Sequence, residues 1–486
     1  MKTIRIILLF ALTPALNLWA AWFDDQYRPQ FHFSRDVRIG DPCGMVRWKG
    51  VWTIFTWDRA TSSDLVYWNL SGWPFRNSVP NTSYFTGSAV VDFSNSSGFG
   101  TITNPPMILA VTLHNDQTLE ENIGIASSTD YANFYFYSGN PVVDGASQIF
   151  RDADVFWDDE HNFWVMLVAH NSQITIMTST DLKFWAFKSD FGPVDGGWQN
   201  FEVPGMARMP VKGVIGKKKW VLFSGPGSRN CQYWVGNFDG TFFTPEGGAQ
   251  FIESGPGRAP QVDFYAAKLF RDYDGGDCLY WWAWMDNWDY ANNLPTSFGS
   301  GYTLVRKLQL AWTGSGYRLA QEPHEGYQKL RGPLVPGIPR KLQGTVSLSE
   351  FQPATNTYEI VANFKLTPQT QKFGFNLCVG NGNKVVLGYD VGAGNIFLDR
   401  TNSGNTGFSG GFPNVRTAAF LPPNGQIQFH IFVDQNSIEV FINDGQIVFT
   451  DLIFPASTSR GIELWSDNGV VQLQSLNAWM LKSIWH

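Results

Sequence analysis

Charged side chains are scarce in this chain of 486 residues, where aspartate, glutamate, lysine and arginine make up 16%, against about 25% in an average globular protein. The formal net charge is −7. This excludes a broad surface for nucleic acid, because such surfaces are strongly basic. The chain is also poor in glutamate, lysine, alanine and leucine, which excludes a coiled coil or a helical bundle.

Cysteine is rare as well, with four residues scattered along the chain: Cys43, Cys231, Cys278 and Cys378. So few cysteines cannot form a disulfide scaffold, and no Cys-x-x-C pair or Cys/His cluster has the spacing of a zinc site. One disulfide bridge stays open as an alternative that the sequence does not assign. We expect neither a metal ion nor a cofactor.

Long apolar runs are confined to the N-terminus. Residues 1–20 carry Lys2 and Arg5, then an apolar stretch, then small residues up to Ala20, which is typical of a secretory signal peptide. No later run approaches the roughly 20 apolar residues that a membrane-spanning helix needs, so we expect no membrane partner. Three glycosylation sequons fit secretion: Asn69, Asn81 and Asn95. The sequence therefore predicts a secreted, extracellular glycoprotein.

Aromatic residues, by contrast, are abundant. They make up 16% of the chain, with 21 tryptophans, 39 phenylalanines and 16 tyrosines. This content argues against disorder and favours strands, while 48 glycines and 26 prolines supply turns. Carbohydrate is one ligand class that suits an aromatic, β-rich protein.

A repeat runs through the first two thirds of the chain. The second residues of four strand-like runs are spaced by 56 residues each, and a fifth run follows after 61. The runs are Val51–Phe55, Met107–Val111, Phe163–Leu167, Lys219–Phe223 and Tyr280–Trp284. A period of this length with several strands per unit is typical of a β-propeller, so we predict five blades over residues 21–340. A β-sandwich with accidental spacing is the weaker alternative.

The remaining part, residues 341–486, has a different pattern. Segments such as Tyr358–Phe364 and Gln426–Val433 alternate apolar and polar residues, with turn signals at Asn381-Gly382 and Asp444-Gly445. This alternation predicts an antiparallel β-sandwich. The fold class is therefore all-β, a five-bladed propeller followed by a C-terminal sandwich.

Three carboxylates lie in similar register within the repeat. Asp41, Asp152 and Glu202 precede the second residue of the first, third and fourth runs by 11, 12 and 18 residues. If the runs are second strands, these carboxylates belong near the first strands, which line the channel of a propeller. Glycoside cleavage needs such a cluster, because one carboxylate attacks the anomeric carbon and another protonates the leaving oxygen. Crowding of like charges would raise the pKa of one member and keep it protonated as the acid. Taken alone, each of these carboxylates is better explained as a residue that caps a turn. The register that all three share favours a catalytic role.

The sequence around these carboxylates resembles glycoside hydrolase family 32, the invertases, inulinases, levanases and fructosyltransferases. Arg38–Gly44 is similar to the Trp-Met-Asn-Asp-Pro-Asn-Gly motif, which implies Asp41 as nucleophile. Phe150–Asp152 resembles the Arg-Asp-Pro motif, which implies Asp152 as transition-state stabiliser. Phe201–Pro204 resembles the Glu-Cys-Pro motif, which implies Glu202 as acid/base. The family implies retaining cleavage of β-fructofuranosidic bonds in sucrose or fructans through a covalent fructosyl-enzyme, without metal or cofactor.

Further residues are candidates for contacting the sugar. They are Arg151, Ser88, Trp57, Asp263 and Trp284. Arg151 lies in the second motif, and Ser88 and Asp263 occupy the first-strand register of the other two blades. Trp57 and Trp284, like Trp288, offer rings on which a sugar can stack, although packing between blades is the alternative for any single tryptophan.

The sequence also departs from the family pattern. Gly40 replaces the motif asparagine, Ala153 the proline and Val203 the cysteine, and the loop that normally precedes Trp57 is shortened. Two alternatives to a hydrolase therefore stay open: a fructosyltransferase that uses the same three carboxylates, and a catalytically weak carbohydrate-binding relative.

Overall fold

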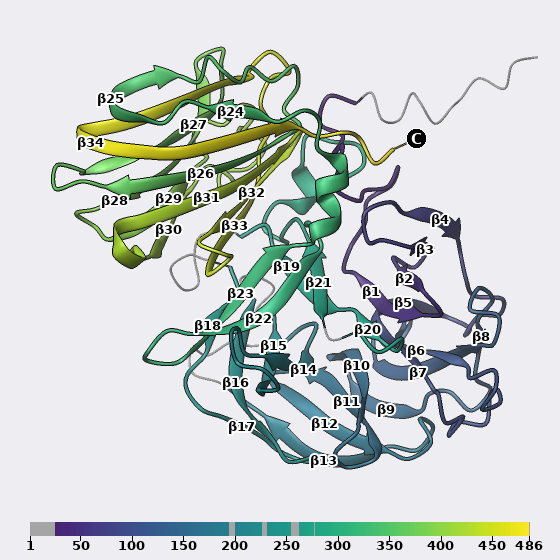
Figure 1. The fold of residues 1–486 in the computed structure, drawn as a ribbon. Helices are drawn as coiled ribbons and strands as arrows, with labels where there is room; N and C mark the ends of the chain where they lie inside the picture. Colours follow the sequence, from purple (N-terminus) through teal and green to yellow (C-terminus); the bar gives the residue numbers. More distant parts are fainter. Residues whose placement is uncertain (1–24, 194–199, 226–230, 254–261, 277, 486) are drawn as a thin grey trace, which may run out of the picture.

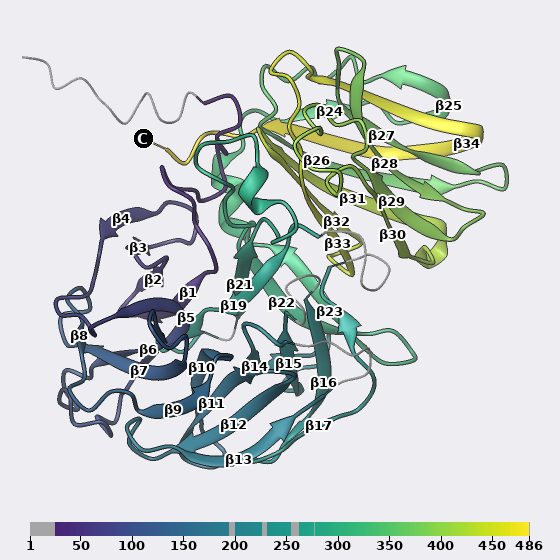
Figure 2. The same ribbon diagram turned by 180° about the vertical axis from the view of Figure 1, so that it is seen from behind.

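The structure is a computed structural model that describes residues 25–193, 200–225, 231–253, 262–276 and 278–485. The expected signal peptide, residues 1–20, lies outside these ranges. Strands form two parts, seen from opposite sides in Figures 1 and 2. Helical structure in the described ranges is limited to three short 3-10 turns, η2 (Ala291–Asn293), η3 (Glu325–Leu330) and η4 (Pro423–Gly425). No helix in these ranges has the length and apolar character to cross a membrane.

Five small sheets follow one another along the chain and form the first part. The first contains β1 (Cys43–Trp48), β2 (Val51–Phe55), β3 (Arg59–Ser62) and β4 (Asn69–Gly72), with β20 (Arg271–Asp272) parallel to β1. The second contains β5 (Thr82–Val91), β6 (Met107–Asn115), β7 (Glu121–Ser128), β8 (Tyr135–Phe136) and β9 (Val143–Ser147). The third contains β10 (Phe150–Asp158), β11 (Phe163–His170), β12 (Gln173–Ser179) and β13 (Ala186–Phe191).

The last two sheets complete the propeller. The fourth contains β14 (Gly205–Pro210), β15 (Lys218–Ser224), β16 (Gln232–Phe238), β17 (Phe243–Pro245) and β18 (Gln250–Phe251). The fifth contains β19 (Tyr265–Leu269), β21 (Leu279–Trp284), β22 (Arg306–Trp312) and β23 (Tyr317–Pro323). The predicted five-bladed propeller is confirmed.

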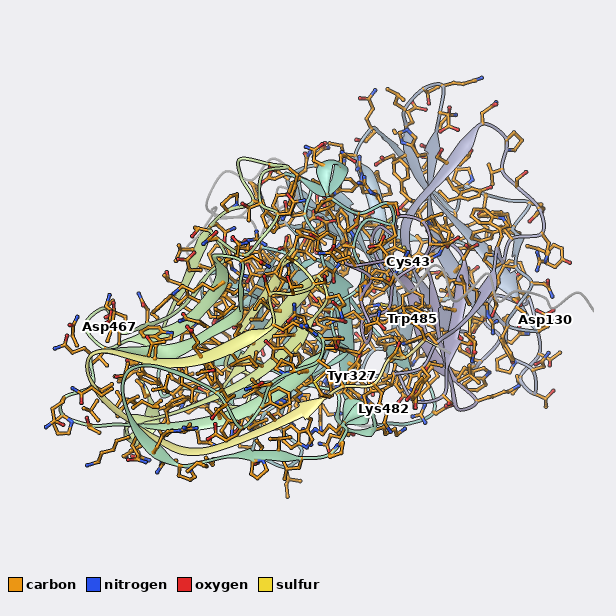
Figure 3. All side chains as sticks on the ribbon, turned by 90° about the horizontal axis from the view of Figure 1, so that it is seen from above. Cys43, Asp130, Tyr327, Asp467, Lys482 and Trp485 are labelled. Atoms are coloured by element: carbon orange, nitrogen blue, oxygen red, sulfur yellow. The ribbon has the colours of Figure 1, made fainter. Side chains whose placement is uncertain are left out.

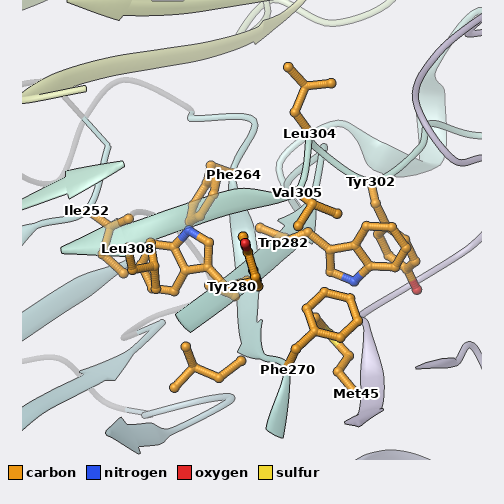
Figure 4. Close-up of a cluster of buried hydrophobic side chains, with 14 of the residues drawn as sticks. Met45, Ile252, Phe264, Phe270, Tyr280, Trp282, Tyr302, Leu304, Val305 and Leu308 are labelled. Atoms are coloured by element: carbon orange, nitrogen blue, oxygen red, sulfur yellow. The ribbon is translucent and has the colours of Figure 1, made fainter. Parts of the chain in front are cut away.

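The five repeated runs form the second strands of the blades, β2, β6, β11, β15 and β21. Neighbouring blades cover these strands on both faces, which explains their apolar character. Trp164 and Trp281 are 0% exposed and Trp52 is 6% exposed. Figure 4 shows a buried cluster where the fifth blade, with Trp282, meets the first, with Met45. Across the same seam the ring centroids of Trp282 and Trp68 are 5.0 Å apart. Most of the aromatic surplus therefore holds the blades together.

Four of the five inner strands carry one extra residue near their start. The register shifts between Cys43 and Val46 in β1, Phe85 and Gly87 in β5, Arg151 and Asp154 in β10, and Tyr265 and Lys268 in β19. Such β-bulges bend a strand and re-aim its side chains. Because all four lie near the beginning of an inner strand, they occur at the same end of the propeller.

The second part is an extended antiparallel sheet folded into two layers, so the predicted β-sandwich is confirmed. Its strands are β24 (Val335–Gly337), β25 (Arg340–Ser347), β26 (Tyr358–Leu366), β27 (Lys372–Gly380), β28 (Asn383–Asp390), β29 (Asn395–Asp399), β30 (Val415–Ala419), β31 (Gln426–Asp434), β32 (Ser437–Ile442), β33 (Ile447–Leu452) and β34 (Gly461–Met480). The long strand β34 serves both layers, pairing with β27 in its first half and with β26 in its second.

The two parts are joined by buried ion pairs. Arg306 of β22 contacts Glu253 at 2.8 Å and Glu439 of β32 at 2.5 Å. His32, near the N-terminal end of the described chain, lies between Asp434 at 2.8 Å and Glu439 at 2.9 Å. All these side chains are fully buried. The sandwich therefore has a fixed place against the propeller.

The end of the chain reinforces this junction. Trp485 donates its indole N–H to the carbonyl oxygen of Pro29 at 2.7 Å. In the view from above, Trp485 and Tyr327 lie between the two parts, whereas Asp467 and Asp130 mark their far ends (Figure 3). The four cysteines are all free, three of them buried, so the bridge that the sequence left open does not form here.

Candidate active site

A cavity of about 500 Å³ opens where the inner strands begin. It is lined by Gly40, Asp41, Cys43, Thr56, Trp57, Tyr84, Phe85, Thr86, Arg151, Asp152, Glu202 and Trp288. The three carboxylates of the repeat therefore meet in one place, although they come from the first, third and fourth blades. Aromatic rings form much of the remaining wall.

Asp41 lies two residues before β1 and is one of the residues that line the cavity. Thr86 donates its hydroxyl to Oδ2 at 2.8 Å, while Oδ1 is buried without a hydrogen-bond partner among the described residues. Enclosure by protein and the negative charge of Glu202 raise the pKa of Asp41 to about 6, although the Thr86 hydroxyl and the charges of Lys268 and Arg151 act in the opposite direction. Near neutral pH Asp41 is thus an ionised carboxylate, and its Oδ1 accepts no hydrogen bond from the described residues.

Asp152 occupies the bulge of β10 in a left-handed backbone conformation, with φ 64°. Non-glycine residues adopt this conformation at a cost, which is typical of functional sites. Its backbone N–H donates to Thr112 Oγ1 at 2.8 Å, and its Oδ2 accepts from the N–H of Val203 at 2.9 Å. Burial, together with the charges of Glu202 and Asp41, raises the pKa of Asp152 well above its usual value.

Glu202 is held from both its backbone and its side chain. Its carbonyl oxygen accepts from Gly225 N–H at 2.9 Å and from the Ser224 hydroxyl at 2.7 Å. Tyr265 donates its hydroxyl to Oε2, and Arg151 Nη1 lies 3.6 Å from Oε1. Burial and the charge of Glu202 raise the pKa of Tyr265 far above its usual value, so the phenol stays a hydrogen donor.

Arg151 is itself fixed by an acid that does not line the cavity. Its Nε donates to Oε2 of Glu121 at 2.8 Å, and the N–H of Phe150 donates to the same oxygen at 3.1 Å. Glu121 is fully buried, and its other oxygen lies 3.3 Å from His114 Nδ1. Arg151 is therefore a preorganised cation between Glu121 and Glu202.

Three residues expected to contact the sugar lie outside the cavity lining. Ser88 is 5% exposed, and its hydroxyl oxygen accepts from Val155 N–H at 3.0 Å, which joins the inner strands of two blades. Asp263 is 0% exposed and pairs with Arg400 of the sandwich. Trp284 is also 0% exposed. These three residues make contacts within the protein, whereas Trp57 and Arg151 line the cavity.

Sequence reasoning missed several neighbours of the carboxylates. Thr86 and Tyr265 each lie two residues from a predicted sugar contact, Ser88 and Asp263 respectively. The bulges in β5 and β19 interrupt the alternation from which such choices are made. Trp288, 48% exposed, is the ring that reaches the cavity, and Trp284 supports it with ring centroids 4.9 Å apart.

One group among the described residues has the geometry of a metal site, but it is not part of the cavity. Asp158, Glu160 and His161 offer ligand atoms within 4.8 Å of one another. They lie at the hairpin between β10 and β11, at the opposite end of β10 from Asp152. The oxygen Asp158 Oδ2 already contacts His161 at 2.7 Å.

Comparison with known proteins shows the family of the chain. The model of the glycosyl hydrolases family 32 N-terminal domain matches residues 39–323, and that of the family 32 C-terminal domain matches residues 335–480. The chain belongs to glycosyl hydrolase family 32. By that membership it is a glycosidase, and the two matched ranges cover the propeller and the sandwich in turn.

Among its relatives in the family is a levanase of Bacillus subtilis (strain 168), 35% identical, with 100% of this chain and 75% of the levanase covered. An extracellular exo-inulinase of Aspergillus awamori is 30% identical, with 100% and 99% covered. The crystal structure of exo-inulinase from the same species superposes with a TM-score of 0.86, covering 95% of this chain and 100% of that one at 30% identity.

The departures from the family pattern have visible consequences. Gly40 lines the cavity, and a Cβ built on it would meet nothing within 4 Å. Val203 has φ 49°, an unusual conformation for a β-branched residue, and its N–H binds Asp152. Only three residues, Thr56 to Asp58, join β2 to β3, so the shortened loop leaves a tight turn at Trp57.

Proposed function

We propose that this chain is a secreted, retaining glycosidase that hydrolyses β-fructofuranosidic bonds in sucrose or fructans. One observation carries the proposal: Asp41, Asp152 and Glu202 line one cavity, and Oδ1 of Asp41 accepts no hydrogen bond from the described residues. The names of its relatives, levanase and exo-inulinase, supply the substrate class. The signal pattern of residues 1–20 and the extracellular relative support secretion. Residues 21–340 then form the catalytic domain and residues 341–486 the sandwich domain.

The first step forms a covalent bond to Asp41. Its Oδ1 attacks the anomeric carbon of the fructosyl unit while Glu202 gives its proton to the glycosidic oxygen, so the bond to the leaving group breaks as the ester bond forms. Tyr265 and Arg151 hold the Glu202 carboxyl in place for this transfer. The leaving sugar departs as an alcohol, and charge is balanced.

The second step releases fructose. Glu202, now a carboxylate, takes a proton from water, which attacks the anomeric carbon and breaks the bond to Asp41. In both steps positive charge develops on the fructosyl ring, and Asp152 stabilises it while binding ring hydroxyls. Two inversions at one carbon give net retention.

Incubation of the purified protein with sucrose, inulin, levan and arabinan tests the proposal. We expect fructose from at least one fructosyl substrate and a loss of about 100-fold or more in Glu202→Gln, the usual effect of removing a general acid. At high sucrose a hydrolase releases equal glucose and fructose, whereas longer oligosaccharides would identify a transferase. Binding without turnover, unaffected by Asp41→Asn, would identify a weak binding relative. No fructose from any substrate would overturn the proposal.

A further inference from the structure

The aromatic wall of the cavity continues beyond it, along the seam between the first and second blades. Trp57 and Tyr84 line the cavity on this side. The next ring outward is Trp73, directly after β4, which stacks on Tyr84 with ring centroids 6.2 Å apart and planes inclined by 30°. Trp73 does not line the cavity but lies against one of its walls.

This outer ring is held in place yet open to solvent. Its edge packs against Phe75 at 5.4 Å, and Phe75 also contacts Trp57 at 5.8 Å. Tyr84 is fixed in turn, because its hydroxyl oxygen accepts from the N–H of Val79 at 3.0 Å. Even so, Trp73 is 49% exposed. Exposed apolar surface that continues a cavity is typical of a ligand groove.

The short turn between β2 and β3 contributes to this side of the cavity, because Thr56 and Trp57 line it. Among the described residues, the connection consists of Thr56, Trp57 and Asp58. Asp58 pairs with Arg35, which holds the turn to the N-terminal segment of the propeller. A chain that leaves the carboxylates therefore passes Trp57 and Tyr84 before it reaches Trp73.

We propose that Trp73 and Tyr84 form an additional subsite that binds fructosyl units remote from the cleaved bond, so that the enzyme favours fructan chains over sucrose. This inference rests on the proposed function. The subsite acts through the face of the Trp73 indole, on which the apolar face of a sugar ring packs while its hydroxyls stay in water. A disaccharide bound at the carboxylates is too short to make the full contact with Trp73, so it gains less binding energy from this subsite than a fructan chain does.

The exposure of Trp73 separates it from the tryptophans that only pack blades. Trp52, Trp164 and Trp281 are at most 6% exposed. Trp312 is as open as Trp73, at 59%, but it ends β22 beside the β14–β15 hairpin, at the opposite end of the propeller from Glu202. Trp312 is therefore a matched control.

The test compares Trp73→Ala and Trp312→Ala by kcat/KM for inulin or levan and for sucrose. We expect Trp73→Ala to lower the ratio of fructan to sucrose kcat/KM by about fivefold, within the range for losing one aromatic contact, and Trp312→Ala to leave it unchanged. Trp73→Leu keeps an apolar side chain but removes the flat ring, and we expect the same fall in the ratio. This variant replaces Trp73→Ala in the test if the alanine variant does not fold. Trp73→Phe should restore most of it.

Binding of inulin and levan to Glu202→Gln, measured by affinity electrophoresis, supplies a readout that needs no turnover. We expect weaker binding when Trp73→Ala is added to this variant. An unchanged ratio together with unchanged fructan binding would overturn the subsite. Wild-type protein that releases no fructose from any substrate would instead overturn the proposed function, and the binding measurement would still decide the role of Trp73.

Discussion

At the scale of single residues, the site depends on how each carboxylate is held. Asp41 accepts one hydrogen bond, from Thr86, and keeps its other oxygen free. Glu202 is bound by Tyr265 and lies near Arg151. In the proposed mechanism Asp41 is the group that attacks and Glu202 the group that transfers the proton.

The pKa of Asp41 predicts the acid side of the pH profile. Because attack requires the carboxylate, kcat/KM should fall as the pH drops through about 6, the value to which burial and Glu202 raise the pKa of Asp41. Thr86→Val removes the hydrogen bond that lowers this pKa, so the acid limb should move to higher pH. A pH series of kcat/KM checks this, with Thr118→Val on an exposed loop as control. An unmoved limb would contradict the role of Thr86.

Tyr265 offers a second test at this scale. Tyr265→Phe removes the hydroxyl that donates to Glu202 and keeps the ring. We expect kcat to fall roughly 10-fold or more, the effect of losing about 1.5–3 kcal/mol of a hydrogen bond to a charged group, with a shifted pH profile. Steady-state kinetics measure both. A loss in kcat without any change in the pH profile would argue that Tyr265 only packs.

At the scale of elements, bulges aim the side chains of the site. The extra residue in β10 is at Asp152, and that in β5 is at Thr86. Gly87 follows Thr86, and a Cβ at this position would lie 1.9 Å from the carbonyl oxygen of Ala110. The bulge of β5 therefore requires glycine.

Gly87→Ala should damage stability and activity together. The clash with β6 forces the strands apart, which we expect to cost about 2 kcal/mol or more and to displace Thr86 from Asp41. Gly247→Ala, where a Cβ meets nothing within 4 Å, is the control. Denaturant unfolding and kcat/KM report the two effects; if Gly87→Ala matched the control in both, the bulge would not need glycine.

The sequence predicted those elements that repeat. The 56-residue spacing comes from the second strands of the blades. Each blade has one such strand packed between its neighbours, so an apolar run recurs once per blade. The bulges do not recur in the sequence pattern, since one extra residue reverses the alternation without changing composition. In β5 the bulge separates Thr86 from Ser88, so an alternation that points to Ser88 does not reveal Thr86 as the neighbour of Asp41. Asp263 accepts hydrogen bonds from Asn287 and Tyr290 of its own blade and pairs with Arg400 of the sandwich, and no period within the propeller reveals that ion pair.

At the scale of the whole molecule, stability should depend on pH through the junction of the two parts. Burial lowers the pKa of His32, but hydrogen bonds and charges from Asp434 and Glu439 outweigh it and raise the pKa to about 9. The unfolded value is about 6.5. The stabilisation, roughly 3 kcal/mol, is therefore complete below pH 6.5 and lost as the pH rises through 9.

Thermal unfolding between pH 6.5 and 9.5 measures this contribution. The Tm of the wild type should decrease from pH 6.5 to pH 9.5. The Tm of His32→Gln should be lower than that of the wild type at pH 6.5 and should decrease less over the same range. His161→Gln, at a partly exposed hairpin, should follow the wild type. A wild-type Tm that stays level to pH 9.5 would contradict a charged His32 at the junction.

The central claim is that Asp41 forms a covalent bond to the fructosyl unit. Fructosyl fluoride needs no protonated leaving group, so Glu202→Ala should still form the intermediate but hydrolyse it slowly. Mass spectrometry of the acid-quenched, digested protein should then find one fructosyl unit on the peptide that contains Asp41, and none in the Asp41→Asn, Glu202→Ala double variant. Turnover of the fluoride with no adduct, or an adduct on another residue, would contradict the account.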